Sequence, residues 1–491
     1  MTARTAGPGF PGRAIALAAL TAALGAVVAF GLLSIASAQA SPVKALVMIA
    51  APAFLILAVL WPDRAALVVP ALVFSNAGLV LNQDYGVPNV LRGSLLLLFA
   101  LLLTRATWRS ALWQSTPILW ASVIFVAVRV LSAIQAPGVD SSQVAFGYMY
   151  GLMVLLLVTA LAARPRYMRA MAFVVVLTAG GIAAATILRR AGIGGTWMGF
   201  AGDTPITAEL QAIMNRSGIP IDLAARVAGP VADPNFWAQC LVLAIPLGFW
   251  AFKTRTGHAS RVLSASVIVV MFAGIMYTQS RGGMIALVIA LSLWMWWQGG
   301  NYRKSLVLVP IAIIVALATT NAATRFSELQ GLTNASQAED GAIRGRLSEN
   351  IAALHMWQDH PVLGVGADQY SSNYREYAKA IGLDSRAERF AHNSYLQMAA
   401  ESGTLGAAAF IGMLVTAFVA GLRARRRLLE AEYFREASLL EAVLAGTLGF
   451  CIAAIFLHQA WPDYLWMSLG FIAGSWLLAE RVRIDRQEAT S

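Results

Sequence analysis

Residues 145–163 read AFGYMYGLMVLLLVTALAA, and this stretch of 19 residues contains no charged side chain. An α-helix rises about 1.5 Å per residue, so about 20 apolar residues are needed to cross the roughly 30 Å hydrocarbon core of a bilayer. The stretch therefore has the length and composition of a membrane-spanning helix. Arg164, Arg166 and Arg169 follow it directly. Because basic residues gather at the cytoplasmic ends of membrane helices, this end of the span is predicted to face the cytoplasm.

Similar apolar runs recur along the chain and predict an all-α, polytopic integral membrane protein with about 14 transmembrane helices. The predicted spans are residues 14–36, 43–61, 65–82, 91–104, 116–135, 145–163, 168–188, 235–252, 262–279, 282–298, 305–321, 403–422, 437–457 and 463–480. The first run follows Arg4 and Arg13 and ends in Ala36-Ser37-Ala38, which would also fit a secretory signal. Its apolar region is longer than an ordinary signal core, so we favour an uncleaved first helix.

The overall composition supports the same class of protein. Of the 491 residues, 58% are hydrophobic and only 12% are charged, whereas soluble domains are about 45–50% apolar and about 25% charged. So few charges cannot form an ordinary water-exposed surface, which excludes a soluble enzyme, a disordered chain and a nucleic-acid-binding domain. The two cysteines, Cys240 and Cys451, lie within apolar runs, so we expect neither a disulfide framework nor a cysteine metal site.

Most basic residues fall on one side of the membrane when the spans alternate from a cytoplasmic N-terminus. That side receives 21 of the 36 lysines and arginines, all in short connections. The opposite short loops at 82–90 and 136–143 contain none. The positive-inside rule therefore predicts that both termini are cytoplasmic. Much of the net charge of +11 then serves orientation and requires no acidic partner.

Two long connections, 189–234 and 322–402, are predicted to lie on the extracytoplasmic face. Helical spacing between residues 347 and 357 predicts one helix in the second connection, and a polar helix is expected at about 367–381. The predicted organisation is N-terminal spans (1–188), a first loop (189–234), central spans (235–321), a large helical loop (322–402) and C-terminal spans with a cytoplasmic tail (403–491).

Several polar residues on this predicted extracytoplasmic side could carry chemistry. Arg226 precedes the eighth span, and Arg281 lies in a connection so short that its side chain must sit at the membrane surface, near the depth of a lipid phosphate. Gly282 and Gly283 would let backbone N–H groups approach an anion. An arginine that extends to lipid headgroups is the alternative explanation of Arg281. His392 stands where the large loop meets the twelfth span, and a structural hydrogen-bonding role is its alternative.

Together these residues resemble the O-antigen ligase superfamily, which also contains Wzy-type glycan polymerases and protein O-oligosaccharyltransferases. The resemblance extends from residue 226 to residue 406. Its motifs are Arg226 with Asp233-Pro-Asn235, the turn Ser280-Arg281-Gly-Gly, the segment His360-Pro-x-x-Gly364-x-Gly366, and His392-Asn393 followed after nine residues by Gly403-x-x-Gly406. The last motif is the most specific and favours a ligase. The chain departs from ligases in having more predicted spans than they usually show.

The resemblance implies a metal-independent, inverting glycosyltransferase of the inner membrane, active in lipopolysaccharide or exopolysaccharide biosynthesis. Its donor would be a glycan linked to undecaprenyl diphosphate, and its acceptor a hydroxyl of another glycan, of the lipid A core, of a protein or of a wall polymer. His392 would be the general base, and Arg281 and Arg226 would stabilise the diphosphate leaving group. Substrate-binding roles are expected for Arg344, Arg346, Asn393, Tyr395, Gly364 and Gly366. We expect no metal, no cofactor and no nucleic-acid partner.

Three other functions stay open at this point. A polymerase of O-antigen or exopolysaccharide repeats would use the same donor and join it to another lipid-linked repeat. A transporter or flippase of lipid-linked glycans would show ionisable residues within its spans. Here Arg129 in the fifth span is the main example, interpreted either as part of a substrate path or as a side chain that snorkels outward. A structural protein of the envelope would tolerate changes at His392 and Arg281.

Overall fold

The computed structural model describes residues 42–104, 116–191, 193, 226–231, 233–308, 341–380, 389–457 and 463–490. Within these ranges all regular structure is helical and no strand is present, which confirms the predicted all-α class. The predicted first span at 14–36, most of the predicted loop at 189–234 and most of the predicted span at 305–321 lie outside the described residues.

Seven helices in the described residues are long and apolar enough to cross a membrane. They are α8 (Pro117–Gln135), α9 (Ser141–Ala162), α10 (Pro165–Arg190), α13 (Pro234–Thr254), α14 (His258–Thr278), α21 (Ser394–Glu430) and α22 (Phe434–Ala453), the last extended by the 3₁₀ turn η5 (Ala454–Phe456). The remaining elements are α2 (Pro42–Leu60), α3 (Pro62–Ala65), α4 (Val68–Phe74), α5 (Ala77–Tyr85), α6 (Val90–Leu103), η2 (Gly229–Val231), α15 (Arg281–Gln298), α16 (Gly300–Lys304), η3 (Ser305–Leu308), α19 (Gly341–Asp359), α20 (Tyr370–Ala380) and α23 (Asp463–Thr490).

The predicted count of fourteen transmembrane helices is not confirmed. The segment from α3 to α5 bends by 64° and would add an eighth span if it crosses as one. Helix α6 has only 14 residues, and at 1.5 Å per residue it extends about 21 Å, less than the hydrocarbon core. Helix α15 begins with an arginine and α23 continues into a charged tail, so neither is apolar enough along its length. Each of these predicted spans does contain a helix. The prediction that each helix crosses the membrane completely rested on hydropathy alone.

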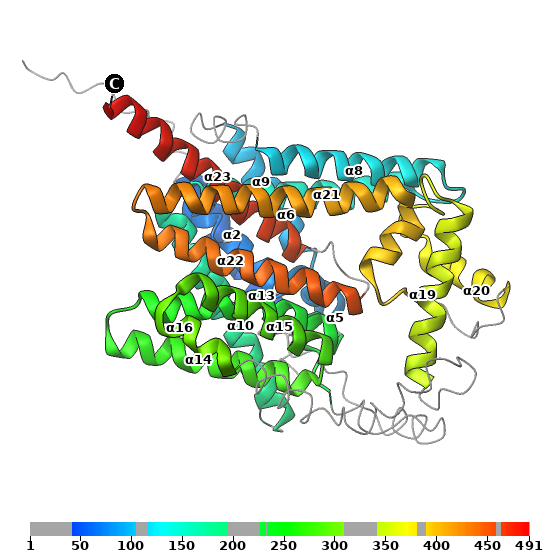
Figure 1. Ribbon diagram of the computed structural model, residues 1–491, viewed down its shortest axis with the longest axis horizontal. Helices are drawn as coiled ribbons and strands as arrows, with labels where there is room; N and C mark the ends of the chain where they lie inside the picture. The colour runs from blue at the N-terminus through cyan, green and yellow to red at the C-terminus, as the bar shows by residue number, and fades with distance from the viewer. Residues whose placement is uncertain are drawn as a thin grey trace, which may run out of the picture.

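The long helices lie side by side along the horizontal axis of Figure 1, and α19 and α20 lie beyond the right-hand end of this bundle. The two helices predicted in the large loop are therefore present. These two helices pack around a small hydrophobic core of their own, which includes Met356, Tyr370 and Tyr374. The side of the membrane that they face stays a prediction.

Small residues let the central helices pack closely. Gly470 and Gly474 are four residues apart on α23 and face α9. A Cβ added to Gly470 would lie 2.8 Å from the backbone oxygen of Leu155, and one added to Gly474 would lie 2.5 Å from that of Thr159. Small residues at this spacing are typical of helix pairs in membranes because they allow the backbones to approach. Helices α9 and α23 accordingly share the most extensive contact among the described elements.

The two ends of the helix bundle carry different groups of residues. The topology prediction assigned these two groups to opposite faces of the membrane. Helix α13 begins near Arg226 and ends at Arg255, and α14 returns from there to the turn that precedes Arg281. Arg166 and Arg169 at the start of α10 and Arg435 at the start of α22 line one pocket together with Arg255. One end of the bundle is thus rich in basic residues, and the other carries α19, α20 and the candidate catalytic residues. Which end is cytoplasmic stays a prediction.

Candidate active site

His392 lies immediately before the helix α21. The backbone of His392 is left-handed, with a φ of 46°, a conformation that few non-glycine residues adopt. Asn393 then caps the helix, because its side-chain oxygen accepts hydrogen bonds from the backbone N–H groups of Tyr395 and Leu396, each at 3.1 Å. Asparagine is a favoured cap residue for this reason. The His-Asn pair therefore places the imidazole at a sharply defined entrance to α21, as the sequence predicts.

The imidazole of His392 is paired with Glu349 of α19. Nδ1 of His392 lies 2.7 Å from Oε2 of Glu349 and 3.1 Å from the backbone oxygen of Phe390. Both oxygens are acceptors, so Nδ1 must carry the proton, and the lone pair of the neutral ring is then on Nε2. The His392 side chain is 27% exposed, whereas that of Glu349 is 1% exposed. A buried carboxylate thus orients an accessible imidazole, which is the arrangement of an acid–base pair in many enzymes.

Two further residues hold Glu349 in place. Nη1 of Arg389 lies 3.1 Å from Oε1 of Glu349, and the hydroxyl of Tyr370 donates to the backbone oxygen of Glu349 at 2.6 Å. Burial, with the Glu349 carboxylate as a smaller cause, raises the pKa of Tyr370, so the phenol keeps the proton that it donates. Sequence analysis missed Glu349, because no motif links it to a histidine 43 residues away.

Arg226 and Arg281 both lie at the turn between α14 and α15. Nε of Arg226 donates to the backbone oxygen of Thr278 at 2.8 Å, and Nη2 donates to Oδ1 of Asn235 at 2.9 Å. Ser280 caps α15 by accepting from the N–H of Gly283, so Arg281 is the first residue of that helix. Both arginines are half-buried. The free N–H groups and positive dipole of a helix N-terminus favour an anion at the same place.

The turn η5 connects the arginine pair with the His392 end of α21. A Cβ added to Gly282 would lie 2.9 Å from Cδ2 of Phe456, the last residue of η5. The neighbouring Leu457 accepts a hydrogen bond from the Ser394 hydroxyl at 2.6 Å. Ser394 is only two residues from His392. The three predicted catalytic residues therefore share one end of the bundle, connected through contacts of neighbouring residues, although they come from segments far apart in the chain.

The predicted substrate-binding residues surround this place in different ways. Arg346 is exposed on α19, one helical turn before Glu349. Of Arg344 the structure describes only its position in α19. The amide oxygen of Asn393 is engaged in capping, and the Tyr395 hydroxyl donates to the backbone oxygen of Cys451 at 2.8 Å. The contacts described for Asn393 and Tyr395 thus serve the fold, and their binding roles stay predictions.

Residues 360–366, here called the glycine segment, pack against a kink in α21. The kink lies at Gly403, whose φ is 64°. The N–H groups of Val365 and Gly366 donate to the backbone oxygens of Ala400 and Glu401 at 2.9 and 3.0 Å, and the N–H of Thr404 donates to Pro361 at 2.7 Å. The segment therefore satisfies backbone groups that the kink leaves without helical partners. A structural role for Gly364 and Gly366 is visible, and their predicted binding role stays untested.

Replacing Gly364 with alanine should lower the stability of the protein by at least about 2 kcal/mol. Gly364 has a φ of 71°, and an added Cβ would lie 2.2 Å from the backbone carbon of Glu401, which cannot give way as a flexible side chain would. Thermal unfolding of the purified protein measures the effect. Gly412→Ala is the matched control, because this glycine of α21 has open space around it. Equal unfolding temperatures for the two variants would show that the packing is dispensable.

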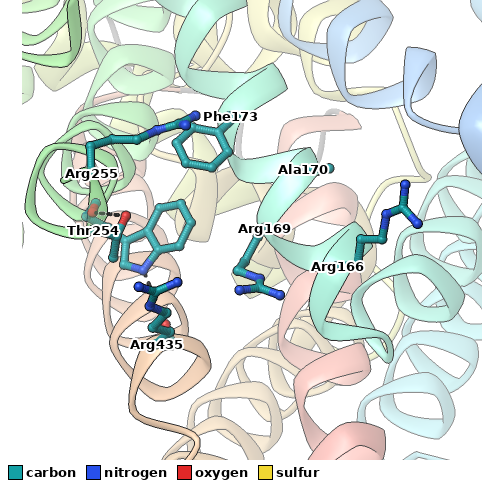
Figure 2. Close-up of a pocket in the computed structure, with 8 residues that line it drawn as sticks. Arg166, Arg169, Ala170, Phe173, Thr254, Arg255 and Arg435 are labelled. Carbon is teal, nitrogen blue, oxygen red and sulfur yellow. Dashed lines mark hydrogen bonds between the residues drawn. The ribbon is translucent and has the colours of Figure 1, made fainter. Parts of the chain in front are cut away.

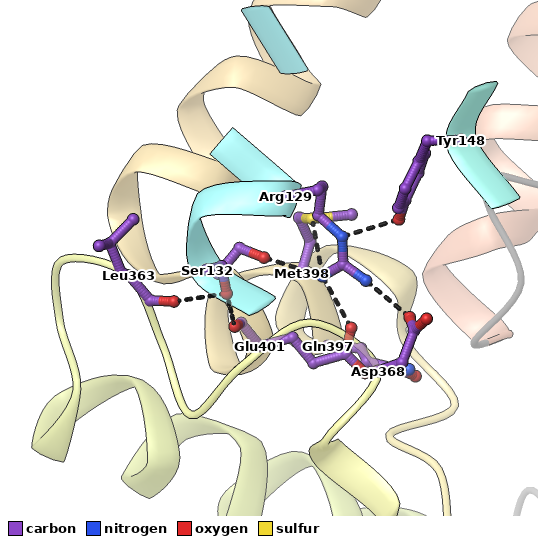
Figure 3. A network of polar contacts seen from close by, with 9 residues as sticks. Arg129, Ser132, Tyr148, Leu363, Asp368, Gln397, Met398 and Glu401 are labelled. Atoms are coloured by element: carbon purple, nitrogen blue, oxygen red, sulfur yellow. Dashed lines mark hydrogen bonds and ion pairs between the residues drawn. The ribbon is translucent and has the colours of Figure 1, made fainter. Parts of the chain in front are cut away.

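Arg129 forms the centre of a buried polar network between α8 and the kink of α21 (Figure 3). Nη1 donates to Oε2 of Glu401 and to the Ser402 hydroxyl, both at 2.8 Å. Nη2 donates to Oδ1 of Asp368 at 2.8 Å, and Nε donates to the Tyr148 hydroxyl at 2.7 Å. The Arg129 side chain is fully buried in protein, so the snorkelling interpretation is wrong. The network joins the fifth predicted span, α8, to α21, the helix that begins directly after His392 and Asn393.

Replacing Arg129 with leucine should destabilise the protein by about 3–5 kcal/mol, because the variant leaves the Glu401 carboxylate buried without its cation. The double variant Arg129→Leu/Glu401→Leu should recover part of this loss, since a hydrophobic pair needs no counter-charge. Thermal unfolding in one detergent compares the two variants with the unchanged protein. A single variant that unfolds at the original temperature would contradict the structural role of this pair.

Metal ligands are not grouped in the described parts of the chain. No cluster of three or more His, Cys, Asp or Glu side chains is arranged there to hold a metal ion. Arg226, Arg281, Arg346 and Arg389 are among the positive charges at this end of the molecule. Arginine holds phosphate and carboxylate groups through paired hydrogen bonds, so these side chains can bind an anionic group.

Residues 266–411 match a protein-family model described as O-antigen ligase. The matched region contains Arg281, Glu349, the glycine segment and His392, whereas Arg226 lies outside it. No curated protein matches the chain. The family match confirms the resemblance that the motifs indicate. This region is therefore similar to the O-antigen ligase family, and the match supports a membrane enzyme of the glycan ligase or polymerase type.

Proposed function

We propose that the protein transfers a glycan from undecaprenyl diphosphate to an acceptor hydroxyl on the extracytoplasmic face of the inner membrane. The observation that carries this proposal is the pairing of His392 with the buried Glu349, at the same end of the bundle as Arg226 and Arg281. An oriented base beside cationic groups is what a displacement of a diphosphate by a hydroxyl requires. The family match and the membrane helices support the same class of reaction.

His392 acts as the general base in this proposal. Nε2 of the neutral imidazole takes the proton of the acceptor hydroxyl while its oxygen attacks the anomeric carbon of the donor. The bond between that carbon and the diphosphate oxygen breaks, and its electron pair stays with the diphosphate. Glu349 stabilises the imidazolium that forms and keeps Nε2 aimed at the acceptor. A single displacement from the face opposite the leaving group inverts the anomeric configuration.

Arg281 and Arg226 stabilise the charge that develops on the leaving diphosphate. The N-terminus of α15 adds backbone N–H groups next to Arg281, in the same direction as the helix dipole. Groups that are already oriented by the fold need no reorganisation when the charge appears, so they lower the barrier more than mobile water does. This electrostatic stabilisation takes the place of a divalent cation in the proposal.

Glu349→Gln tests the positioning role of the carboxylate. The variant should lower kcat by about 10- to 1,000-fold with little change in KM, because glutamine can favour the wrong tautomer and cannot stabilise the imidazolium. Its pH profile for kcat should shift as well, which a purely structural role would not produce. Glu376→Gln, an exposed carboxylate of α20, is the matched control. An unchanged kcat and pH profile in Glu349→Gln would exclude this role.

Ligase and polymerase share the donor and differ in the acceptor, so one experiment in cells separates them. The protein is deleted, and the glycan left on undecaprenyl diphosphate is sized. Long unattached chains identify a ligase, which the His-Asn-x9-Gly-x-x-Gly motif favours, and single repeats identify a polymerase. An unchanged profile contradicts both. A flippase would instead leave its donor on the cytoplasmic face, and its main support weakens because Arg129 is committed to a network that joins two helices.

A further inference from the structure

A pocket of about 320 Å³ lies at the basic end of the bundle, away from the candidate active site. Four arginines line it, from three separate segments: Arg166 and Arg169 of α10, Arg255 after α13, and Arg435 at the start of α22. Figure 2 shows the Arg255 side chain beside the Phe173 ring, with Arg435 and Arg169 below it and Arg166 farther away on α10. Neither the family resemblance nor the transfer mechanism uses any of these residues.

The positive charge of this pocket is poorly compensated within the protein. Among the described residues, the guanidinium groups of Arg166, Arg255 and Arg435 make no ion pair with a carboxylate. Nε of Arg169 lies 3.5 Å from Oε1 of Glu436, longer than a good hydrogen bond. Several like charges around one cavity repel one another unless an anion is bound between them. The pocket therefore has the electrostatic character of an anion site.

The pocket is also built by fixed contacts. Arg255 ends α13 with an extended backbone, and its guanidinium carbon lies 4.0 Å from the centre of the Phe173 ring. Nε1 of Trp250 donates to the backbone oxygen of Arg435 at 3.2 Å, which ties α22 to α13. Stacking on an aromatic ring holds an arginine in one orientation and leaves its N–H groups available to an anion. These contacts hold Arg255 and the start of α22 in defined positions around the pocket.

We propose that this pocket binds the phosphate headgroup of an anionic phospholipid. The pocket lies where α10 begins and α13 ends, which is the depth of lipid headgroups if both helices cross the bilayer. Leu177 lies one turn along α10 from Phe173 and is 54% exposed, so an apolar side chain is available to an acyl chain next to the pocket. Basic pockets between transmembrane helices bind such headgroups. The proposal is independent of glycan transfer.

The test measures lipid selectivity on the purified full-length protein. Native mass spectrometry counts phosphatidylglycerol and phosphatidylcholine bound from equal mixtures, for the unchanged protein and for Arg255→Gln, Arg435→Gln and Arg166→Gln. Each substitution should lower the preference for phosphatidylglycerol by about fivefold, the effect of one basic residue near a membrane surface. Arg426→Gln is the matched control, because Arg426 is 82% exposed at the same end but outside the pocket. A ratio of bound lipids does not move when a substitution only lowers stability.

Three outcomes would overturn the proposal. The unchanged protein could bind both lipids equally, or the three pocket variants could keep the original preference for phosphatidylglycerol. In the third outcome, millimolar inorganic phosphate would displace the lipid from the unchanged protein, which would identify a soluble phosphate compound as the ligand. Retention of phosphatidylglycerol in the presence of phosphate, together with the loss of preference in the variants, supports a lipid site.

Discussion

Replacing His392 with alanine is expected to lower the rate of glycan transfer by about 10²–10⁴-fold, the usual contribution of a general base. The side chain is partly exposed and lies outside the main core, so membrane insertion and stability should change little. Transfer is measured with the purified protein under saturating donor, and folding is checked by thermal unfolding. His258→Ala provides the control, since His258 is exposed at the opposite end of the bundle.

The unfolding temperature of the His392→Ala variant distinguishes a general base from a histidine that has only a structural role. If His392 only stabilised the loop, the alanine variant would unfold at a lower temperature and would regain activity on cooling. If His392 is the base, the unfolding temperature stays the same and the rate stays low. Near-normal transfer by a well-folded His392→Ala protein would rule out the general-base role.

Replacing Arg281 with alanine is expected to lower kcat by about 10²–10³-fold, as the loss of one preorganised group at a developing negative charge does. Arg281→Lys should restore only a small part of the rate if the contact with the diphosphate is bidentate, because lysine is a point charge. Arg303→Ala is the matched control, since Arg303 lies just beyond the other end of α15 and is exposed. Full activity in Arg281→Lys would show that charge alone is sufficient.

The helices were predictable because their signal is local. A run such as 145–163 is apolar over its whole length, and the structure places α9 there. The capping role of Asn393 follows from the same short-range chemistry, since its oxygen bonds to residues two and three positions later. The number of crossings was harder to predict, because α6 and α15 are apolar helices that fall short in length or hydropathy.

The partners of the charged residues could not be predicted, because they depend on contacts between distant segments. Arg129 and Glu401 are 272 residues apart, and His392 and Glu349 are 43 apart. Each pair forms only after several helices have packed. The glycine segment shows the same limit: the motif was visible in the sequence, but its packing against the backbone of Glu401 was not. The motifs predicted the candidate site, and the tertiary contacts added Glu349 to it.

The most direct test of the proposed reaction is a transfer assay with the purified protein in the presence of a metal chelator. The donor is a glycan of known anomeric configuration on undecaprenyl diphosphate, and the products are separated and analysed by NMR. We predict a glycoside of inverted configuration together with released undecaprenyl diphosphate, at a rate that the chelator does not change. Loss of transfer on chelation, or a product of retained configuration, would contradict a single displacement driven by His392 and the arginines.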